Sequence, residues 1–490
     1  MTRDVFIPAG YLEQSVAEYR GNPLIEALPP IHSEEAAAVA MSNFPDIPTD
    51  EERRQPKEIR LHCIDRLKRL VQPMPIHLEL EGVVSSVIRG GYVGRNPMVA
   101  GTWRHLYSLS TDRGAASEFV SSASSFSLVG LSGIGKSTAL NSILKLYPQV
   151  IRHQKYHDRG FVHTQITYLK LDCPHDGSLS GLCRAFFRAV DVALGQDRYL
   201  RRIRPRAGVP ELVQMMEQAA STFFIGALFI DEIQHLRVAK TGGKENMLNF
   251  FVNLINCIGI PVAFIGTNSM VELFADVMRN ARRACDMGDH EFQQPKQDDP
   301  VWNLLLNAVW QYQWVQAPGP LTPDIRGRLY DLTQGVTDFL TKLMILGQRY
   351  AIQTGKETLT PEVFSYVADT KMKLLKPAIS ALRSGNPEQM RRFEDLLPTD
   401  EQFKFMMEPN DGGTLQARLN ILENMPSPLV SHVEMVSPTQ VGPNVASPPI
   451  VQRPSEALQF AQQTDSVAAL KQAGWLLTDP FEFSLAYCSA

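Results

Sequence analysis

A phosphate-binding loop is the clearest chemical signal in the sequence. The string GLSGIGKS (130–137) fits the pattern GxxxxGK[ST] and lies between a short apolar run and a helical pattern. Glycines let backbone N–H groups turn toward phosphate oxygens, and the N-terminus of the helix adds partial positive charge. Lys136 would neutralise phosphate charge, and the hydroxyl of Ser137 could bind Mg²⁺. We therefore expect ATP and Mg²⁺ at this loop.

A pair of carboxylates supplies the second half of such a site. In ALFIDEIQHL (227–236), an apolar run ends at Asp231, and Glu232 follows directly. Asp231 could hold Mg²⁺ with its water shell, while Glu232 could polarise a water for attack on the γ-phosphate. Taken alone, two carboxylates at the end of a strand are most often surface residues without a catalytic role. Downstream of a phosphate-binding loop, they indicate ATP hydrolysis.

Three further polar residues are candidates for catalytic roles. Asn268 follows the next apolar run, in IGTNSM (265–270), where a polar side chain can orient the attacking water or simply end a strand. Arg282 and Arg283 stand twelve or more residues later, and an arginine there could reach the γ-phosphate of a neighbouring subunit. A solvated helix face explains the same two arginines equally well, so both interpretations stay open.

Three basic stretches could contact the phosphate backbone of duplex DNA. They are RHQKYHDR (152–159), RYLRRIRPR (198–206) and LRVAKTGGK (236–244), and each taken singly could be no more than a solvated surface. The last one places two lysines around a short TGG turn, which suits a loop laid against phosphates. Our candidate contacts are Lys155, Arg201, Arg202, Lys240, Thr241 and Lys244.

The elements around these residues predict an α/β fold. Nearly continuous apolar runs at 126–130, 164–172, 227–231 and 261–267 indicate strands that are covered on both faces. After the phosphate-binding loop, apolar residues recur at helical spacing until Pro148. Strands that alternate with helices predict a parallel sheet flanked by helices, the architecture of a P-loop NTPase.

Composition divides the rest of the chain. A proline-containing arm (1–65) is expected to be mostly extended, and no convincing strand follows the nucleotide-binding core (66–290). Two long helical patterns, YDLTQGVTDFLTKLMILGQRYAIQ (330–353) and PEVFSYVADTKMKLL (361–375), indicate a helical lid. We assign the remaining segments as follows: lid 291–385, C-terminal helical segment 386–425, Pro-rich linker 426–454 and an apolar tail, 455–490, suited to docking on a partner.

Charge, cysteine usage and hydropathy exclude several classes of protein. The net charge is −4, so any DNA contact must come from local basic patches. The six cysteines are scattered without a CxxC pair, which argues against a zinc site or a disulfide framework and fits a reducing cytoplasm. We see no secretory leader and no apolar run of membrane-spanning length, so we expect a cytoplasmic protein.

Several longer strings resemble one family, the TnsC/TniB family of AAA+ regulators of DNA transposition, and within it the TnsC branch. Besides the phosphate-binding loop, the resemblance rests on AEYRGNPLIEALPPI (17–31), SSVIRGGYVGRNP (85–97), YLKLDCPHDGSLSGLCRAFF (168–187), GALFIDEIQHL (226–236) and FIGTNSM (264–270). It covers roughly residues 17–380, and the Pro-rich segment lies beyond it.

The resemblance implies an AAA+ ATPase with slow, regulatory hydrolysis. Such a protein would assemble as a ring or filament of identical subunits on duplex DNA and link a target-selecting protein, through the arm, to the transposase. It implies metal binding by Asp231 and water activation by Glu232. It also implies adenine framing by Ile88, Arg89 and Tyr92, and phosphate binding within the loop by Gly130, Gly133, Ile134, Gly135, Lys136, Ser137 and Thr138.

Two other kinds of protein fit part of the pattern. One is a different DNA-associated AAA+ ATPase, such as a replication initiator or helicase loader, although residues 390–490 show no basic DNA-reading module. The other is a signalling ATPase that binds nucleotide as a switch and never touches DNA. In the lid, the string GVTDFLTK (335–342) carries no arginine, so the lid's usual contact with the nucleotide has no assigned residue.

Overall fold

The computed structural model describes residues 6–104, 121–174, 176–236, 250–251, 254–255, 259–270 and 287–386. The chain divides into two compact units, Met1–Gln416 and Ala417–Ala490, and every described residue lies in the first. The predicted C-terminal segments, linker and tail (387–490) therefore lie outside the described residues. None of the described helices has both the length and the apolarity needed to cross a membrane.

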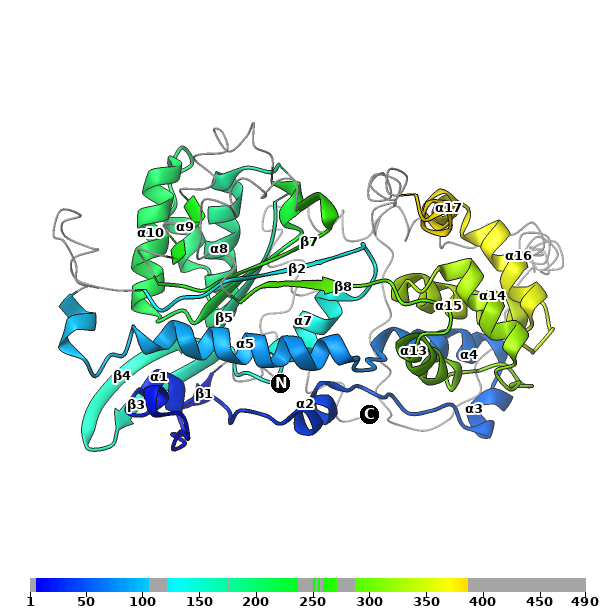
Figure 1. Cartoon of the computed structure of the whole chain (residues 1–490), viewed down its shortest axis with the longest axis horizontal. Coiled ribbons are helices and arrows are strands. Elements are labelled where there is room, and N and C mark those ends of the chain that lie inside the picture. The colour runs from blue at the N-terminus through cyan, green and yellow to red at the C-terminus, as the bar shows by residue number, and fades with distance from the viewer. Residues whose placement is uncertain are drawn as a thin grey trace, which may run out of the picture. The chain divides into compact units, whose positions relative to one another are not determined.

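A five-stranded parallel sheet forms the centre of the nucleotide-binding core (Figure 1). The phosphate-binding loop follows one strand and the carboxylate pair follows another, with a third strand between them. The strand order is β5 (Tyr168–Asp172), β6 (Ala227–Asp231), β7 (Val262–Gly266), β2 (Phe126–Gly130) and β8 (Asp289–Phe292). The predicted parallel sheet is confirmed.

Both faces of this sheet are covered by helices. Along β6, Phe229 belongs to a core that includes α5 (Pro75–Val93) and α7 (Lys136–Leu144), whereas Ile230 belongs to a second core with α8 (Leu179–Leu194). Successive side chains of a strand point to opposite faces, so a strand covered on both sides must be apolar throughout. α10 (Val209–Thr222) joins the second core, on the side away from α5 (Figure 1).

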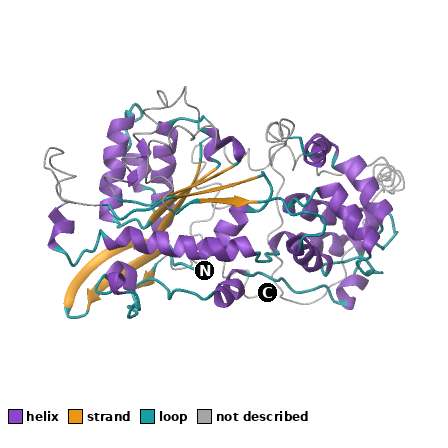
Figure 2. Ribbon diagram, in the orientation of Figure 1, coloured by secondary structure: helices purple, strands orange, loops and turns teal. Residues whose placement is uncertain are grey.

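One predicted strand divides in two. Instead of a single strand over 164–172, the chain leaves β4 (Arg159–Ile166) at the buried Thr167 and enters β5. β4 pairs with β3 (Val150–Tyr156) in an antiparallel hairpin that extends beyond the central sheet (Figure 2). A short N-terminal strand, β1 (Ile7–Pro8), pairs with β3 on its other side.

Five α-helices build the described part of the lid, and four of them have a proline in their first two positions. The predicted helix through YDLTQGVTDFLTK is interrupted, because Gln334 and Gly335 adopt φ of 51° and 75° and end the first of two helices. These left-handed residues turn the chain sharply. The lid helices are α13 (Pro300–Trp310), α14 (Pro323–Thr333), α15 (Thr337–Gln353), α16 (Pro361–Lys371) and α17 (Lys376–Ser384).

The N-terminal arm is less extended than its sequence predicts. It contains short helical pieces: η1 (Ala17–Tyr19), α1 (Pro23–Glu26), α2 (Glu34–Met41), α3 (Asp50–Arg54), α4 (Lys57–Cys63) and η2 (Ile64–Arg69). Most of them start at a capping Asn, Ser or Thr or directly after a proline, which are signals for short helices. The arm contacts the core at one end and the lid at the other.

At the core, the arm is fixed to the β3–β4 hairpin by buried hydrogen bonds. The hydroxyl of Tyr11 lies 2.9 Å from Nδ1 of His153, and the hydroxyl of Tyr156 donates to Glu26 at 2.8 Å. The ring nitrogen Nε2 of His153 lies 2.8 Å from Oε1 of Gln165. These contacts satisfy polar groups that would otherwise be costly to bury.

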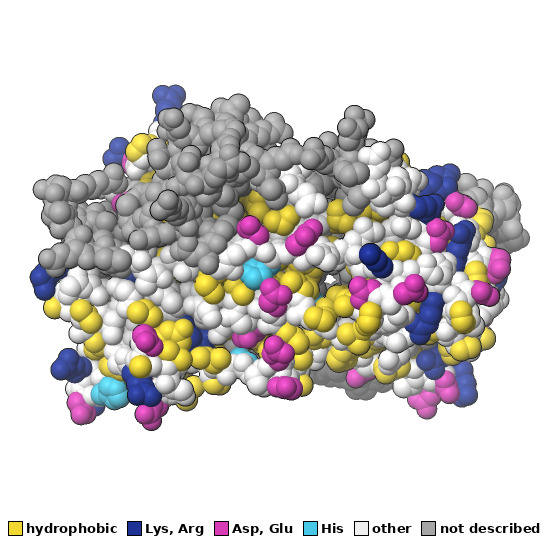
Figure 3. Space-filling model, in the orientation of Figure 1, with side chains coloured by type: hydrophobic (Ala, Val, Ile, Leu, Met, Phe, Trp, Pro, Cys, Tyr) yellow, Lys and Arg dark blue, Asp and Glu magenta, His cyan; other side chains and the backbone are white. Residues whose placement is uncertain are grey.

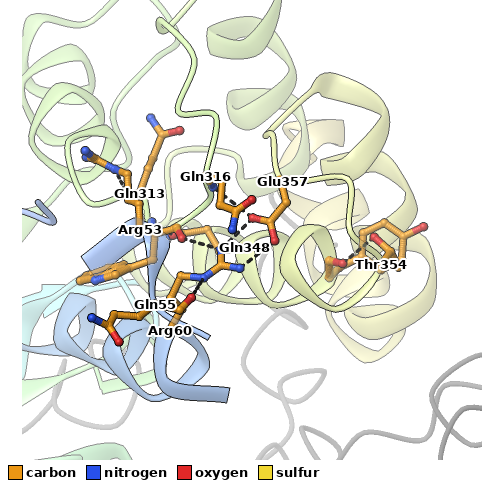
Figure 4. Close-up of polar contacts among 10 residues, drawn as sticks. Arg53, Gln55, Arg60, Gln313, Gln316, Gln348, Thr354 and Glu357 are labelled. Carbon is orange, nitrogen blue, oxygen red and sulfur yellow. Dashed lines mark hydrogen bonds and ion pairs between the residues drawn. The ribbon is translucent and has the colours of Figure 1, made fainter. Parts of the chain in front are cut away.

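At the lid, the arm is fixed by a buried ion pair. The Arg60 guanidinium is fully buried and donates to both carboxylate oxygens of Glu357, each at 2.7 Å, and to the carbonyl oxygen of Trp314 at 3.0 Å (Figure 4). Hydrogen bonding to Arg60 lowers the pKa of the Glu357 carboxyl. Arg53 adds a bond to the carbonyl of Gln313. The bidentate geometry makes this the firmest contact between arm and lid.

Candidate nucleotide site

The phosphate-binding loop follows β2 and leads directly into α7. Gly133 and Gly135 have φ of 77° and 115°, which L side chains rarely adopt. A Cβ on Gly130 would lie 2.8 Å from the Cβ of Phe292, so only glycine lets β2 pass β8 here. Lys136 is buried, and its ammonium donates to the carbonyl oxygens of Gly130 and Leu131 at 2.7 and 2.9 Å.

The predicted metal ligands lie together, one in the first turn of α7 and the other at the end of β6. Oγ of Ser137, in the first turn of α7, donates to Oδ2 of Asp231 at 2.8 Å. Asp231 ends β6 and is buried, while Lys170 on the neighbouring β5 lies 3.0 Å from the same oxygen. Two hard oxygen ligands at this distance fit Mg²⁺, which proteins usually bind through few direct ligands and several waters. The lysine balances the buried charge of the carboxylate.

Glu232 occupies a strained position directly after β6. Its φ is 56°, unusual for a residue with a side chain, and its N–H donates to Oδ1 of Asp231 at 3.0 Å. Such backbone strain often marks functional sites. The carboxylate lies beside Gln234 and His235, at 2.5 and 3.7 Å. Glu232 also lines the cleft above the phosphate-binding loop, as a water-activating residue must.

A cleft of about 430 Å³ lies above the loop, within the size range of small-molecule sites. One wall is the loop from Ser132 to Thr138, and a second is the start of lid helix α15. The third wall comes from the end of the arm and the start of α5, and is lined by Leu67, Lys68, Leu70, Val71, Gln72, Met74 and His77. A mostly apolar wall opposite a phosphate site suits a nucleotide base.

His77 adds no charge to that third wall. Burial lowers its pKa to about 4, so the ring is neutral at physiological pH. Its Nδ1 accepts the N–H of Met74 at 3.1 Å, which fixes the turn leading into α5. Val71 is held by a two-way backbone bridge with Asn43. The wall therefore follows directly after the arm, and Asn43 of the arm helps to hold it in place.

The residues predicted to frame the adenine lie elsewhere, which corrects that prediction. Ile88, Arg89 and Tyr92 are all buried in α5 and none of them lines the cleft. Arg89 donates to the carbonyl of Pro29 and to Ser85, and the hydroxyl of Tyr92 donates to the carbonyl of Phe224. These side chains pack α5 against the arm and the sheet, because α5 turns that face away from the phosphates.

The lid contributes residues that the sequence did not assign. The N–H of Asp338 donates to the carbonyl of Gly133 at 3.0 Å, and the hydroxyl of Thr337 donates to that of Ile134 at 3.1 Å. Lys342, one turn further along α15, pairs with Asp338 at 2.6 Å and lines the cleft. These residues belong to the string GVTDFLTK, which the sequence analysis left without an assigned contact to the nucleotide. They reach the phosphate-binding loop only after the lid has folded.

The remaining candidates are dispersed or lie outside the described residues. Asn268 follows β7 at the same sheet edge as Asp231, and it is exposed rather than among the residues that line the cleft. Arg282, Arg283, Lys240, Thr241 and Lys244 fall outside the described residues. Lys155 is exposed on β3 and pairs with Asp158, while Arg201 and Arg202 are exposed on α9 (Arg198–Arg202).

Other reactive chemistry has little support in this region. The described residues contain no group of three or more His, Cys, Asp or Glu side chains that could hold a metal ion by themselves. Cys173 lies beside the site, and its N–H donates to the carbonyl of Asp231 at 2.9 Å. Burial, helped by the charges of Asp176 and Glu232, raises the pKa of its thiol to about 12. A protonated thiol is a poor nucleophile, so the carboxylate remains the reactive group.

The comparison with protein families agrees with this architecture. Residues 119–274 match the family model described as AAA domain. Similar solved structures include Cdc6p from Pyrobaculum aerophilum (15% identity, 61% of this chain, 79% of that chain, TM-score 0.36) and the ORC1 protein of Aeropyrum pernix in complex with DNA (17%, 61%, 78%, 0.36). Another is the Walker-type ATPase PABY2304 of Pyrococcus abyssi (13%, 58%, 83%, 0.36). No curated protein matches the sequence. The chain therefore contains an AAA domain, and its fold is that of an AAA+ P-loop NTPase.

Proposed function

We propose that this chain is an ATPase that uses Mg²⁺ and ATP to assemble on duplex DNA and regulate DNA transposition. The observation that carries the ATPase part is the meeting of Ser137, Asp231 and Glu232 above a buried Lys136. Together these residues provide a phosphate-binding loop, two oxygen ligands for Mg²⁺ and a carboxylate base. This combination supports hydrolysis of the bond between the β- and γ-phosphates.

Each residue would have a separate task during hydrolysis. Lys136 would leave the carbonyl oxygens of the loop and bind phosphate oxygens, and Ser137 and Asp231 would hold Mg²⁺. The ion, when bound, supplies positive charge against the phosphates. Glu232 would take the proton of the attacking water. The N-terminus of α15, bonded to the loop, would sense whether the cleft is filled.

DNA binding is supported by arginines on one side of the core. Around α8 and α9 they far outnumber the two acidic partners that pair with them, Asp197 and Glu211. Arginines and lysines that meet phosphates bind DNA irrespective of sequence and with strong salt dependence. The exposed arginines are Arg188, Arg198, Arg201, Arg202, Arg204 and Arg206.

The transposition part rests on the resemblance of the longer sequence strings to the TnsC/TniB family. Within this proposal the arm is the candidate contact for the target-selecting protein. It exposes several large apolar side chains, namely Ile31, Val39, Phe44 and Ile47. Figure 3 shows hydrophobic side chains gathered over the middle of one face, with acidic ones among them. Contiguous exposed apolar surface favours a protein partner. The tail, 455–490, is the candidate contact for the transposase.

Filter binding on unrelated DNA duplexes, with and without a non-hydrolysable ATP analogue, tests assembly. We expect binding that needs nucleotide, is similar on all duplexes and weakens steeply with salt; the variant R201A/R202A should flatten the salt dependence. K373A, an exposed change in the lid, is the control. Binding to one sequence alone would favour a replication initiator, and no DNA binding would favour a signalling ATPase.

The transposition role needs a separate experiment. Purified chain, duplex DNA and ATP would be mixed with a transposase and target selector from a related element, and strand-transfer products counted. We expect insertion to require the chain and its nucleotide. Deletion of 455–490 should abolish recruitment of the transposase without changing ATP or DNA binding. Full insertion activity in the absence of the chain would refute the proposed role.

A further inference from the structure

Gln234 bridges the ends of two neighbouring strands beside the candidate base. It lies in the short η3 turn (Ile233–His235) that directly follows Glu232. Its Nε2 donates to Oε2 of Glu232 at 2.5 Å, and its Oε1 accepts the N–H of Thr267 at 3.2 Å. The orientation of the amide is fixed by its neighbours, because a carboxylate can only accept and a backbone N–H can only donate.

The sheet register explains why one side chain reaches both places. Ile230 pairs with Phe264, so the end of β7 runs past the end of β6 and alongside the turn. Ile233 is fully buried and anchors that turn. The strained backbone of Glu232 starts it, and Gln234 then points back across the sheet edge.

Gly266 leaves the space that the amide occupies. A Cβ at this position would lie 2.6 Å from Oε1 of Gln234, closer than real side-chain contacts. The nearest other atoms, of Ile233 and Met270, are 3.1 and 3.2 Å away, so the end of the glutamine side chain would have to move first. The Gln234 amide can therefore occupy this position only because residue 266 is a glycine.

The surroundings leave Glu232 with few other fixed contacts. His235 is farther away, at 3.7 Å, and both of these side chains are substantially exposed. Thr267 is buried, and within the described part of the chain its hydroxyl has no hydrogen-bond partner. Asn268, the candidate water-orienting residue, comes next in the sequence. Gln234 thus connects the base to the strand end from which that residue projects.

We infer that Gln234 is a positioning residue for hydrolysis. It holds the Glu232 carboxylate, which lines the cleft, at a fixed position relative to the end of β7, the strand end that Asn268 follows. This inference rests on the proposed ATPase function. An amide that spans two strand ends also transmits any shift of β7 to the base, which would make hydrolysis sensitive to contacts made by that edge of the sheet.

The variant Q234L tests the inference, since leucine keeps much of the volume and loses both hydrogen bonds. We expect the kcat for ATP hydrolysis to fall by roughly 10- to 100-fold, the range for a hydrogen bond to a charged group. The affinity for a non-hydrolysable ATP analogue and the melting temperature should stay unchanged. Q234E keeps the acceptor for Thr267, removes the donor and places a second negative charge beside Glu232, so it should lose at least as much kcat as Q234L.

A double variant separates positioning from general damage. If Gln234 acts only through Glu232, E232Q/Q234L should hydrolyse ATP no more slowly than E232Q. G266A should lower kcat by displacing the amide, and it should cost nothing further in a Q234A background. Multiplicative losses, unchanged kcat in Q234L or a parallel loss of ATP affinity would overturn the inference. Unchanged turnover in E232Q would instead assign the base to another residue, and absence of ATP hydrolysis by the natural chain would overturn the proposed function.

Discussion

Lys136 lies buried beneath the phosphate-binding loop, where its charge is held by two carbonyl oxygens. We expect K136A to weaken ATP binding by roughly 10- to 100-fold, because a charged hydrogen-bond donor contributes about 1.5–3 kcal/mol. Titration calorimetry with a non-hydrolysable analogue measures this. K145A, an exposed change at the other end of α7, is the control. Normal affinity in K136A would place the nucleotide elsewhere.

Glu232 allows binding and hydrolysis to be separated. E232Q keeps the shape of the side chain and removes its basicity, so ATP should bind normally and persist. The hydrolysis rate should fall by roughly 10²- to 10⁴-fold, as expected for loss of a general base. Phosphate release measures the rate, and E211Q, an exposed carboxylate on α10, is the matched control. A full rate in E232Q would assign the base to another residue.

At the scale of elements, the arm and the hairpin share a buried histidine. Burial lowers the pKa of His153 to about 4, below its ordinary value of 6.5. As pH falls, His153 therefore gains its proton near pH 6.5 in the unfolded chain but only near pH 4 in the folded chain. Protonation thus favours the unfolded state between these values, and stability is lost as pH falls through this window. A shift of this size lowers the free energy of unfolding by roughly 3 kcal/mol once the pH is below both pKa values.

We expect H153Q to reduce the loss of stability between pH 7 and about pH 5, because the variant has no proton to gain at this position. Urea unfolding followed by circular dichroism at several pH values measures it. H62Q, at an exposed histidine in α4, should leave the pH dependence unchanged. The buried His77 keeps part of the dependence in both variants. Equal pH profiles for H153Q and the natural chain would contradict this account.

Local patterns predicted the elements that hold the chemistry. β2, β6 and β7 are strands because their residues are apolar on both faces, and this is visible in five-residue runs. The phosphate-binding loop was likewise a local signal. The division at Thr167 was missed because the residues around it favour one continuous strand. The break at Gln334 was missed although Gly335 is a local signal for a helix end, because apolar residues at helical spacing lie on both sides of it.

The other walls of the cleft could not be predicted for a different reason. Met74, His77 and Asp338 have no chemistry of their own that indicates a nucleotide, and they meet the loop only after the arm and the lid have docked. The adenine prediction failed because it used a resemblance to place Tyr92, whose side chain belongs to the packing of α5. Gln234 was invisible in the sequence because its role depends on the register of two strands.

At the scale of the whole described unit, Arg60 connects the arm to the lid. R60A leaves the partly exposed Glu357 carboxylate without its bidentate partner, and loss of a hydrogen-bonded partner by a charged group costs about 1.5–3 kcal/mol. We expect a lower melting temperature and also weaker ATP binding, because the arm continues directly into the wall at Leu67–Met74. Calorimetric melting with and without ATP measures both. R54A, at an exposed position in α3, is the control.

The outcome for R60A separates two roles of the arm. If the arm only covers the lid, melting temperature should fall while ATP affinity stays normal. If it shapes the cleft, both should fall together, and saturating ATP should restore part of the lost stability by mass action. Unchanged values of both would mean that Arg60 is not needed for docking.

The contact between Arg60 and Glu357 also sets an order of events during synthesis. The two residues are 297 positions apart, so the arm leaves the ribosome long before its partner exists. At translation rates of roughly 5–20 residues per second, that interval lasts about 15–60 s. During it the apolar side chains that later pack on the lid have no cover, which is the condition that recruits chaperones to a nascent chain. The cleft is therefore completed late, when the last lid helices have emerged and the first-made segment closes over them.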